Sequence, residues 1–107
     1  MTTKLQNILD GAQKKVDDYL AENKYDCIKF SNSFLTHGQA IKFNIMIAKR
    51  SEGLIVFNQV LPVKFLMMQD EKEAVDFIFD STMVTIKKIA KLDKEADEEE
   101  KIGIKFN

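Results

Sequence analysis

A strict alternation over residues 40–49 constrains the fold of this chain more than any other feature. One side of this period-two repeat holds four apolar residues, Ile41, Phe43, Ile45 and Ile47. Such an alternation, rich in β-branched and aromatic residues, predicts a strand with one buried face. Turn-like segments precede and follow it, at residues 36–39 and 50–53. We therefore expect residues 40–49 to form the middle strand of an antiparallel meander.

Two further apolar stretches predict the neighbouring strands. Residues 25–35 are the first strand candidate, in which Asn32 interrupts the apolar face and indicates a strand end or a bulge. Residues 54–61 are the third candidate. Because this stretch is apolar on both sides through Phe57, we expect both of its faces to be covered.

The third strand is followed by an ambiguous segment. Pro62 cannot donate a ladder hydrogen bond, so the chain must bend, bulge or lie at a sheet edge there. Residues 63–68 are either a short fourth strand or an apolar lead into the next helix. We favour the fourth strand.

Residues 3–23 predict an amphipathic helix. Apolar residues recur there at spacings of three and four, which gives one continuous stripe. Thr3 and Gln6 match a capping box and mark the helix start. Gly11 in mid-helix either allows close packing against the sheet or has no special role.

A second, longer helix is predicted to begin after Asp70, with Glu73 in the capping-box position. One face of it carries Val75, Ile78, Phe79, Thr82, Ile86 and Ile89. Phe77 and Val84 lie well off that face. Packing on a sheet needs an apolar stripe only about 100° wide. The excess indicates that either the first helix or another subunit covers the remainder.

The length of 107 residues suits one domain, and 31% charged residues suit a soluble protein. We predict an α+β fold, an antiparallel meander of three to four strands flanked by both helices, over residues 1–92. Residues 93–107 form an acidic tail with six acidic residues and three lysines, so the rest carries a net charge of only +2. At its end Ile102, Ile104 and Phe106 alternate, which is compatible with strand addition or with a frayed terminus.

Nothing in the sequence forms a catalytic, metal-binding or cofactor-binding motif. Cys27 and His37 are the single residues of their kinds, and no zinc-ligand spacing exists. We expect Cys27 to be a small buried hydrophobe. No signal-peptide core and no stretch of membrane-spanning length is present, so we expect a cytoplasmic, non-enzymatic protein without membrane association.

The predicted order of helix, three strands and helix is similar to that of the double-stranded RNA-binding domain. The string Lys87-Lys88-Ile89-Ala90-Lys91 also matches the lysine signature of that family in letters. The family places these lysines at the start of its final helix, whereas here they close the helix. The helix start is acidic, which repels phosphate. We do not transfer the function of that family.

The sequence favours an interaction or structural module that forms a homo-oligomer or docks on a larger protein assembly. The small size also suits an accessory protein of a phage or mobile element, either a virion component or an inhibitor. The candidate interface residues are Val56, Phe77, Val84, Ile102, Ile104 and Phe106. The alternative is binding of single-stranded nucleic acid on the second sheet face, with the acidic tail as a partner or autoinhibitory segment. Its candidate contacts are Lys29, Lys42, Lys49, Arg50 and Lys64.

Overall fold

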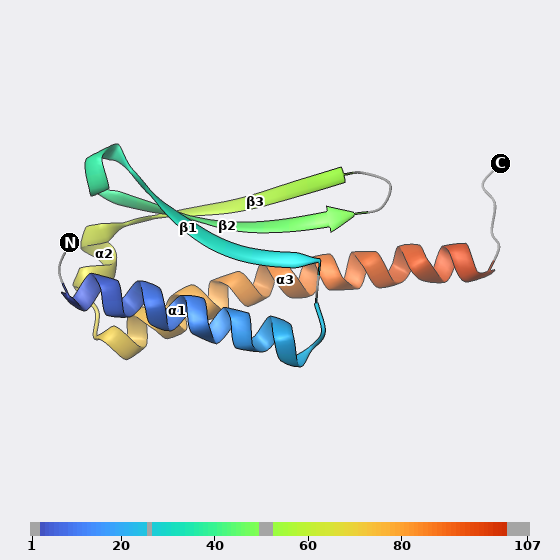
Figure 1. The fold of residues 1–107 in the computed structure, drawn as a ribbon, viewed down its shortest axis with the longest axis horizontal. Helices are drawn as coiled ribbons and strands as arrows, with labels where there is room; N and C mark the ends of the chain where they lie inside the picture. Colours follow the sequence, from blue (N-terminus) through green and yellow to red (C-terminus); the bar gives the residue numbers. More distant parts are fainter. Residues whose placement is uncertain (1–2, 26, 50–52, 103–107) are drawn as a thin grey trace.

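A computed structural model describes residues 3–25, 27–49 and 53–102, without the side chains of residues 49 and 90–102. The predicted α+β class is confirmed (Figure 1). The elements in chain order are α1 (Thr3–Glu22), β1 (Ile28–Leu35), the single-turn 3-10 helix η1 (Thr36–Gly38), β2 (Ala40–Lys49), β3 (Gly53–Pro62), α2 (Val63–Met67) and α3 (Glu71–Ile102).

The three strands form one antiparallel sheet in the order β1-β2-β3. The middle position of β2 and its bounds are as the alternation predicts. Its apolar side is buried at Ile41, Phe43, Ile45 and Ile47. The period-two repeat therefore decides which face of the sheet points into the core.

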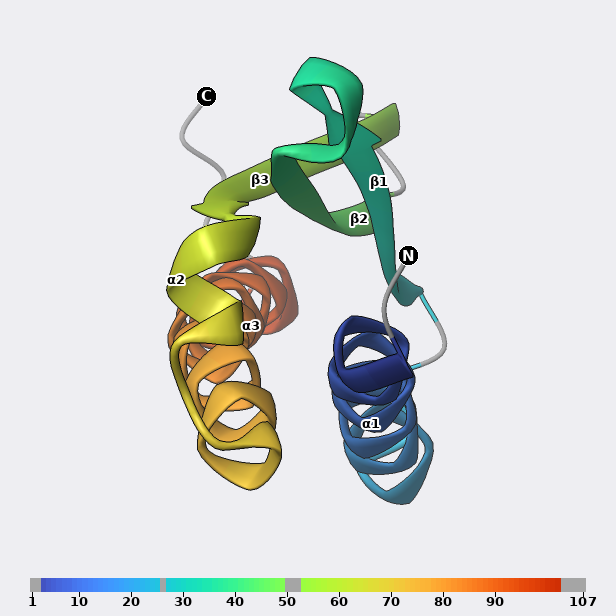
Figure 2. The ribbon, with the colours of Figure 1, turned by 90° about the vertical axis from the view of Figure 1, so that its left-hand side faces the viewer.

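Both long helices lie on the same side of the sheet, with α1 on the β1 side and α3 on the β3 side (Figure 2). Their apolar stripes fill the core together with the buried face of β2. The predicted stripe of α3 is confirmed, since Ile78, Thr82, Ile86 and Ile89 are buried. Phe30 and Phe43 stack within this core, with ring centroids 5.9 Å apart. The other side of the sheet carries no described helix (Figure 2).

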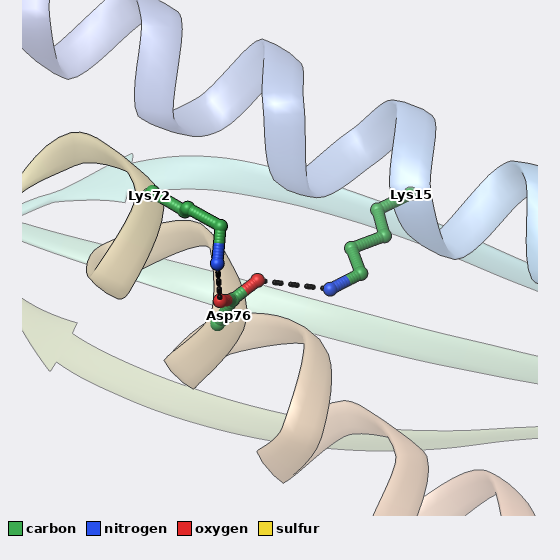
Figure 3. Close-up of polar contacts among 3 residues, drawn as sticks. All are labelled: Lys15, Lys72 and Asp76. Atoms are coloured by element: carbon green, nitrogen blue, oxygen red, sulfur yellow. Dashed lines mark hydrogen bonds and ion pairs between the residues drawn. The ribbon is translucent and has the colours of Figure 1, made fainter.

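Polar contacts connect α1 to α3. The carboxylate of Asp76 in α3 binds Lys15 Nζ of α1 at 2.9 Å and Lys72 Nζ at 3.2 Å (Figure 3). These two hydrogen-bonded ammonium groups hold the pKa of Asp76 below its ordinary value. Lys15 Nζ also lies 4.4 Å from the ring centroid of Phe79. One lysine of α1 therefore contacts two residues of α3.

The prediction of a fourth strand is wrong, because the segment after Pro62 forms the short helix α2. Leu66 is buried there, and Val63 and Met67 pack partly against the core. These three positions are spaced by three and four residues, as one face of a helix requires. Pro62 ends the edge strand β3 in an extended conformation and is the N-cap of α2. Of the three alternatives expected at Pro62, a bend, a bulge or a sheet edge, the proline thus lies on an edge strand.

Two details of the first strand are also corrected. β1 begins at Ile28 and not at residue 25. Asn32 causes no bulge, since it pairs with Phe43 in an unbroken register. Burial on the helix side of β1 decreases after Phe30, and Phe34 is 40% exposed. Asn32 therefore lies where the helices cease to cover the strand.

The backbone of α3 continues as a helix through most of the acidic run, to Ile102. The proposed division of the chain at residue 92 thus falls inside a helix, and it stays a prediction. Among the described residues, no helix combines the length and the hydrophobicity needed to cross a membrane.

Candidate functional site

The outer edge of β3 carries backbone groups that point away from the sheet. The Ala48 N–H donates to the Cys27 carbonyl at 3.1 Å, so the even-numbered residues of β2 bond to β1. In an antiparallel strand, the N–H and C=O of one residue point to the same side, and successive residues alternate. The odd-numbered residues of β2 therefore bond to the odd-numbered residues of β3 opposite them. The even-numbered residues from Leu54 to Val60 direct their N–H and C=O groups outward, where the described sheet ends.

The side chains of these same residues lie on the uncovered face of the sheet. Leu54, Val56 and Val60 are exposed there, and Phe57 is exposed on the helix side. The prediction that both faces of this strand are covered is therefore wrong. Both long helices occupy the opposite face (Figure 2), and at Phe57 they leave even that face partly open. The apolar composition of a strand shows that its side chains are suited to burial. Which of them are buried depends on where the helices pack.

A second exposed apolar strip borders β3 on the helix side. The Ser81 hydroxyl of α3 donates to Gln59 Oε1 of β3 at 3.0 Å, which fixes the face of α3 that borders the strand. Phe77 and Val84 flank Ser81 at helical spacings of four and three, so they share that face. Phe77 also meets Phe65 of α2 edge to face, with ring centroids 5.1 Å apart.

We call these exposed apolar residues of β3, α2 and α3 the open side. Their exposed fractions range from 38% to 66%. The open side consists of Leu54, Val56, Phe57, Val60, Phe65, Phe77 and Val84. A surface of this kind is typical of a protein interaction site, whereas singly scattered apolar residues need no explanation.

The opposite edge of the sheet differs. On β1 the outward carbonyl of Phe30 accepts a hydrogen bond from Gln13 Nε2 of α1 at 2.8 Å. Lys29 adds an exposed charge beside it. An interaction with α1 and a lysine are two means by which proteins block edge pairing. The described strand β3 contains no charged residue at all.

The predicted interface residues are brought together only in part. Val56, Phe77 and Val84 are exposed and belong to the open side. Ile104 and Phe106 lie outside the described residues. The backbone of Ile102 is described, but its side chain is not. Sequence reasoning missed Leu54, Phe57, Val60 and Phe65. The available signal was the absence of any charge over residues 53–63, which is unusual for a strand at a sheet edge.

The candidate nucleic-acid contacts do not form a compact basic patch. Lys29 and Lys42 both lie on the uncovered face, in different rows of the sheet. Lys64 belongs to α2, and the Lys49 side chain and Arg50 lie outside the described residues. No described aromatic side chain lies on the uncovered face, since every phenylalanine of the strands faces the helices. Base stacking, the main contact to single strands, therefore has no platform there.

The described cysteine, histidine and acidic side chains form no cluster that could hold a metal ion. Cys27 is exposed, so its prediction as a buried residue is wrong. The alternation of β1 points Ile28, the next residue, into the core instead. His37 lies in η1 with a left-handed backbone, φ 54°. No three His, Cys, Asp or Glu side chains gather at one point of the described chain. A shallow hollow between α1 and β1 is bordered by Gln13 and Asp17, which bond each other.

In comparisons with known proteins, no family model, no curated protein and no solved structure matches this chain.

Proposed function

We propose that this protein is a non-enzymatic interaction module that self-associates through its open side. The observation that carries the proposal is the state of β3, which is apolar, uncharged and exposed along an edge with outward backbone groups. Burial of apolar surface drives association at roughly 25 cal/mol per Å² before the costs of binding. Docking on a larger assembly through the same surface is the second form of this proposal.

Two parts of the sequence-based expectation belong to this proposal. A cytoplasmic location rests on the single cysteine, which allows no disulfide within the chain. A role as an accessory protein of a phage or mobile element rests on the small size of the chain and on the absence of a catalytic motif from its sequence.

The alternative of single-stranded nucleic-acid binding is supported less well. Lys29 and Lys42 give the uncovered face some positive charge, but the aromatic platform is missing among the described residues. Retention on single-stranded DNA at low salt, declining steeply as salt rises, would favour this alternative.

Self-association is tested by sedimentation velocity over a wide range of protein concentration. We expect a monomer–dimer equilibrium, with the dimer dominant at the upper end. A chain that sediments as a monomer at every concentration would contradict self-association.

The contribution of the open side is tested by replacing Phe77 and Val84 with glutamine. Val84 is 66% exposed, so its replacement should leave the fold intact. Loss of an interface anchor typically costs about 1–2 kcal/mol or more, so we expect the dimer dissociation constant to rise at least about tenfold. The matched control is Glu73→Gln on the exposed first turn of α3. An unchanged dissociation constant in the Phe77 and Val84 variant would exclude this surface.

A further inference from the structure

The outer edge of β3 is suited to one particular partner. It offers outward N–H and C=O groups along a strand of ten residues, Gly53–Pro62. Edge groups of this kind, which pair with no other described strand, are a template for a further strand. The absence of charge along β3 means that an incoming strand also needs no complementary charge. The sequence of β3 itself meets this condition.

We propose that a second copy of this chain pairs along the outer edge of β3, with the two strands antiparallel and Asn58 on the two-fold axis. The two sheets then form one continuous sheet of six strands. This inference rests on the proposed self-association and specifies its geometry.

The register follows from matching side chains across the axis. When Asn58 of one copy lies opposite Asn58 of the other, Val56 of each copy lies opposite Val60 of the other copy. The two Asn58 amides can hydrogen-bond each other, so on the uncovered face of the joined sheet no polar side chain lies opposite an apolar one. Pro62 lies opposite Leu54 at both ends, where a missing N–H costs least. A shift that places Phe57 on the axis would instead oppose Val56 with Asn58.

The other edge of the sheet argues for a closed dimer. If β3 of one copy paired with β1 of a second copy, one β1 edge and one β3 edge would remain free. Further copies would then add to these edges and form a filament. That arrangement requires the outward carbonyl of Phe30, which Gln13 already occupies. Pairing of β3 with β3 uses only the open edge of each copy, so the assembly ends at two chains.

The pairing also brings the remainder of the open side toward the axis. Phe57 lies opposite Gln59 of the second copy on the helix side of the joined sheet. The α3 strip with Phe77 and Val84 borders the same strand, as the Ser81–Gln59 contact shows. Contacts on both faces of the joined strands therefore reinforce the backbone ladder.

The decisive experiment is an isotope-filtered NOE measurement on the unaltered protein, with one labelled and one unlabelled copy per dimer. In this register residues 57 and 59 form a non-hydrogen-bonded pair across the axis, because their N–H and C=O groups point toward β2. Pairs of this kind bring the two backbones closest together. We expect an intermolecular contact between the Hα atoms of Phe57 and Gln59. A Phe57–Phe57 contact, or a dimer with contacts elsewhere, would overturn the register or the pairing and leave the proposed self-association in place. A chain that stays monomeric would overturn both.

A pair of lysine substitutions gives a second readout. Asn58→Lys places two cations opposite each other on the axis, whereas Ser31→Lys lies on the same row of the sheet at the closed edge, since both residues pair with Asn44. Like charges directly opposite destabilise a strand pair, and each 1.4 kcal/mol is tenfold in affinity. We expect at least about a tenfold weaker dimer for Asn58→Lys and no change for Ser31→Lys, with circular dichroism confirming the fold. Equal effects of the two substitutions would overturn the pairing.

Discussion

Gly11 sets the distance between the two long helices. A β-carbon added there would lie 3.0 Å from Cγ2 of Val75, which is closer than ordinary van der Waals contact. The sequence predicted either close packing or no role for this glycine, and close packing is the outcome. The neighbour, however, is α3 and not the sheet. A glycine in a helical pattern indicates that something approaches closely, but only the tertiary arrangement identifies it.

We expect Gly11→Val to lower the free energy of unfolding by about 1–3 kcal/mol, because the added methyl groups overpack the contact with Val75. Val75→Ala in the same chain should restore part of this loss. A double-mutant cycle by urea denaturation measures the coupling. Additive effects would contradict a direct contact between these two positions.

The ion pairs of Asp76 predict that stability depends on pH. Its pKa in the folded protein lies below the ordinary value of 3.8, chiefly because of its hydrogen bonds to Lys15 and Lys72. Its stabilising contribution is therefore complete above the unfolded-state pKa and is lost as the pH falls through the lower folded-state pKa. We expect Asp76→Asn to reduce the dependence of unfolding free energy on pH below about pH 4. The exposed carboxylate makes this effect small and sensitive to salt.

The measurement for Asp76 is urea unfolding at a series of acidic pH values. The control is Asp80→Asn, four residues further along α3. Identical pH profiles for the unaltered protein and Asp76→Asn would show that the ion pairs do not contribute.

At the scale of elements, the predictions succeeded where periodicity was unambiguous. β2 alternates strictly, and α1 repeats at three and four residues, so both were placed nearly to the residue. Residues 63–68 are apolar except at Lys64, so their sequence contains no clear period that separates a strand from a helix. Only the burial of Leu66, with Val63 and Met67 beside it, shows the helical spacing. The exposure of β3 could not be predicted either, since it depends on the position at which α3 packs against the sheet.

The packing of α2 can be tested at its single buried residue. Leu66 is fully buried, whereas Met68 just beyond the helix is 78% exposed. Leu66→Ala should lower the free energy of unfolding by about 2–5 kcal/mol, because it leaves a cavity. Met68→Ala should change the free energy by no more than about 0.5 kcal/mol. Equal effects in urea denaturation would contradict the helical placement of this segment.

For the whole molecule, the fold class was within reach of the sequence and the candidate site largely was not. Val56, Phe77 and Val84 were identified because they are apolar residues in excess of what one core needs. The remaining residues of the open side required the three-dimensional arrangement, in which two helices cover one face of the sheet and leave the edge at β3 uncovered (Figure 2). A site of this type has no sequence motif, because any apolar, uncharged strand can provide it.

The lack of charge in β3 has a consequence for the chain before it folds. A run of β-branched and aromatic residues without a charge is the type of segment that forms cross-β aggregates when it is exposed during synthesis. In the sequence, Lys49, Arg50 and Glu52 precede this run and Lys64 follows it. Charged residues at both ends act as gatekeepers, because stacking such segments in register would bring like charges together. The edge can therefore remain free of charge for a specific partner, while its flanks oppose uncontrolled stacking.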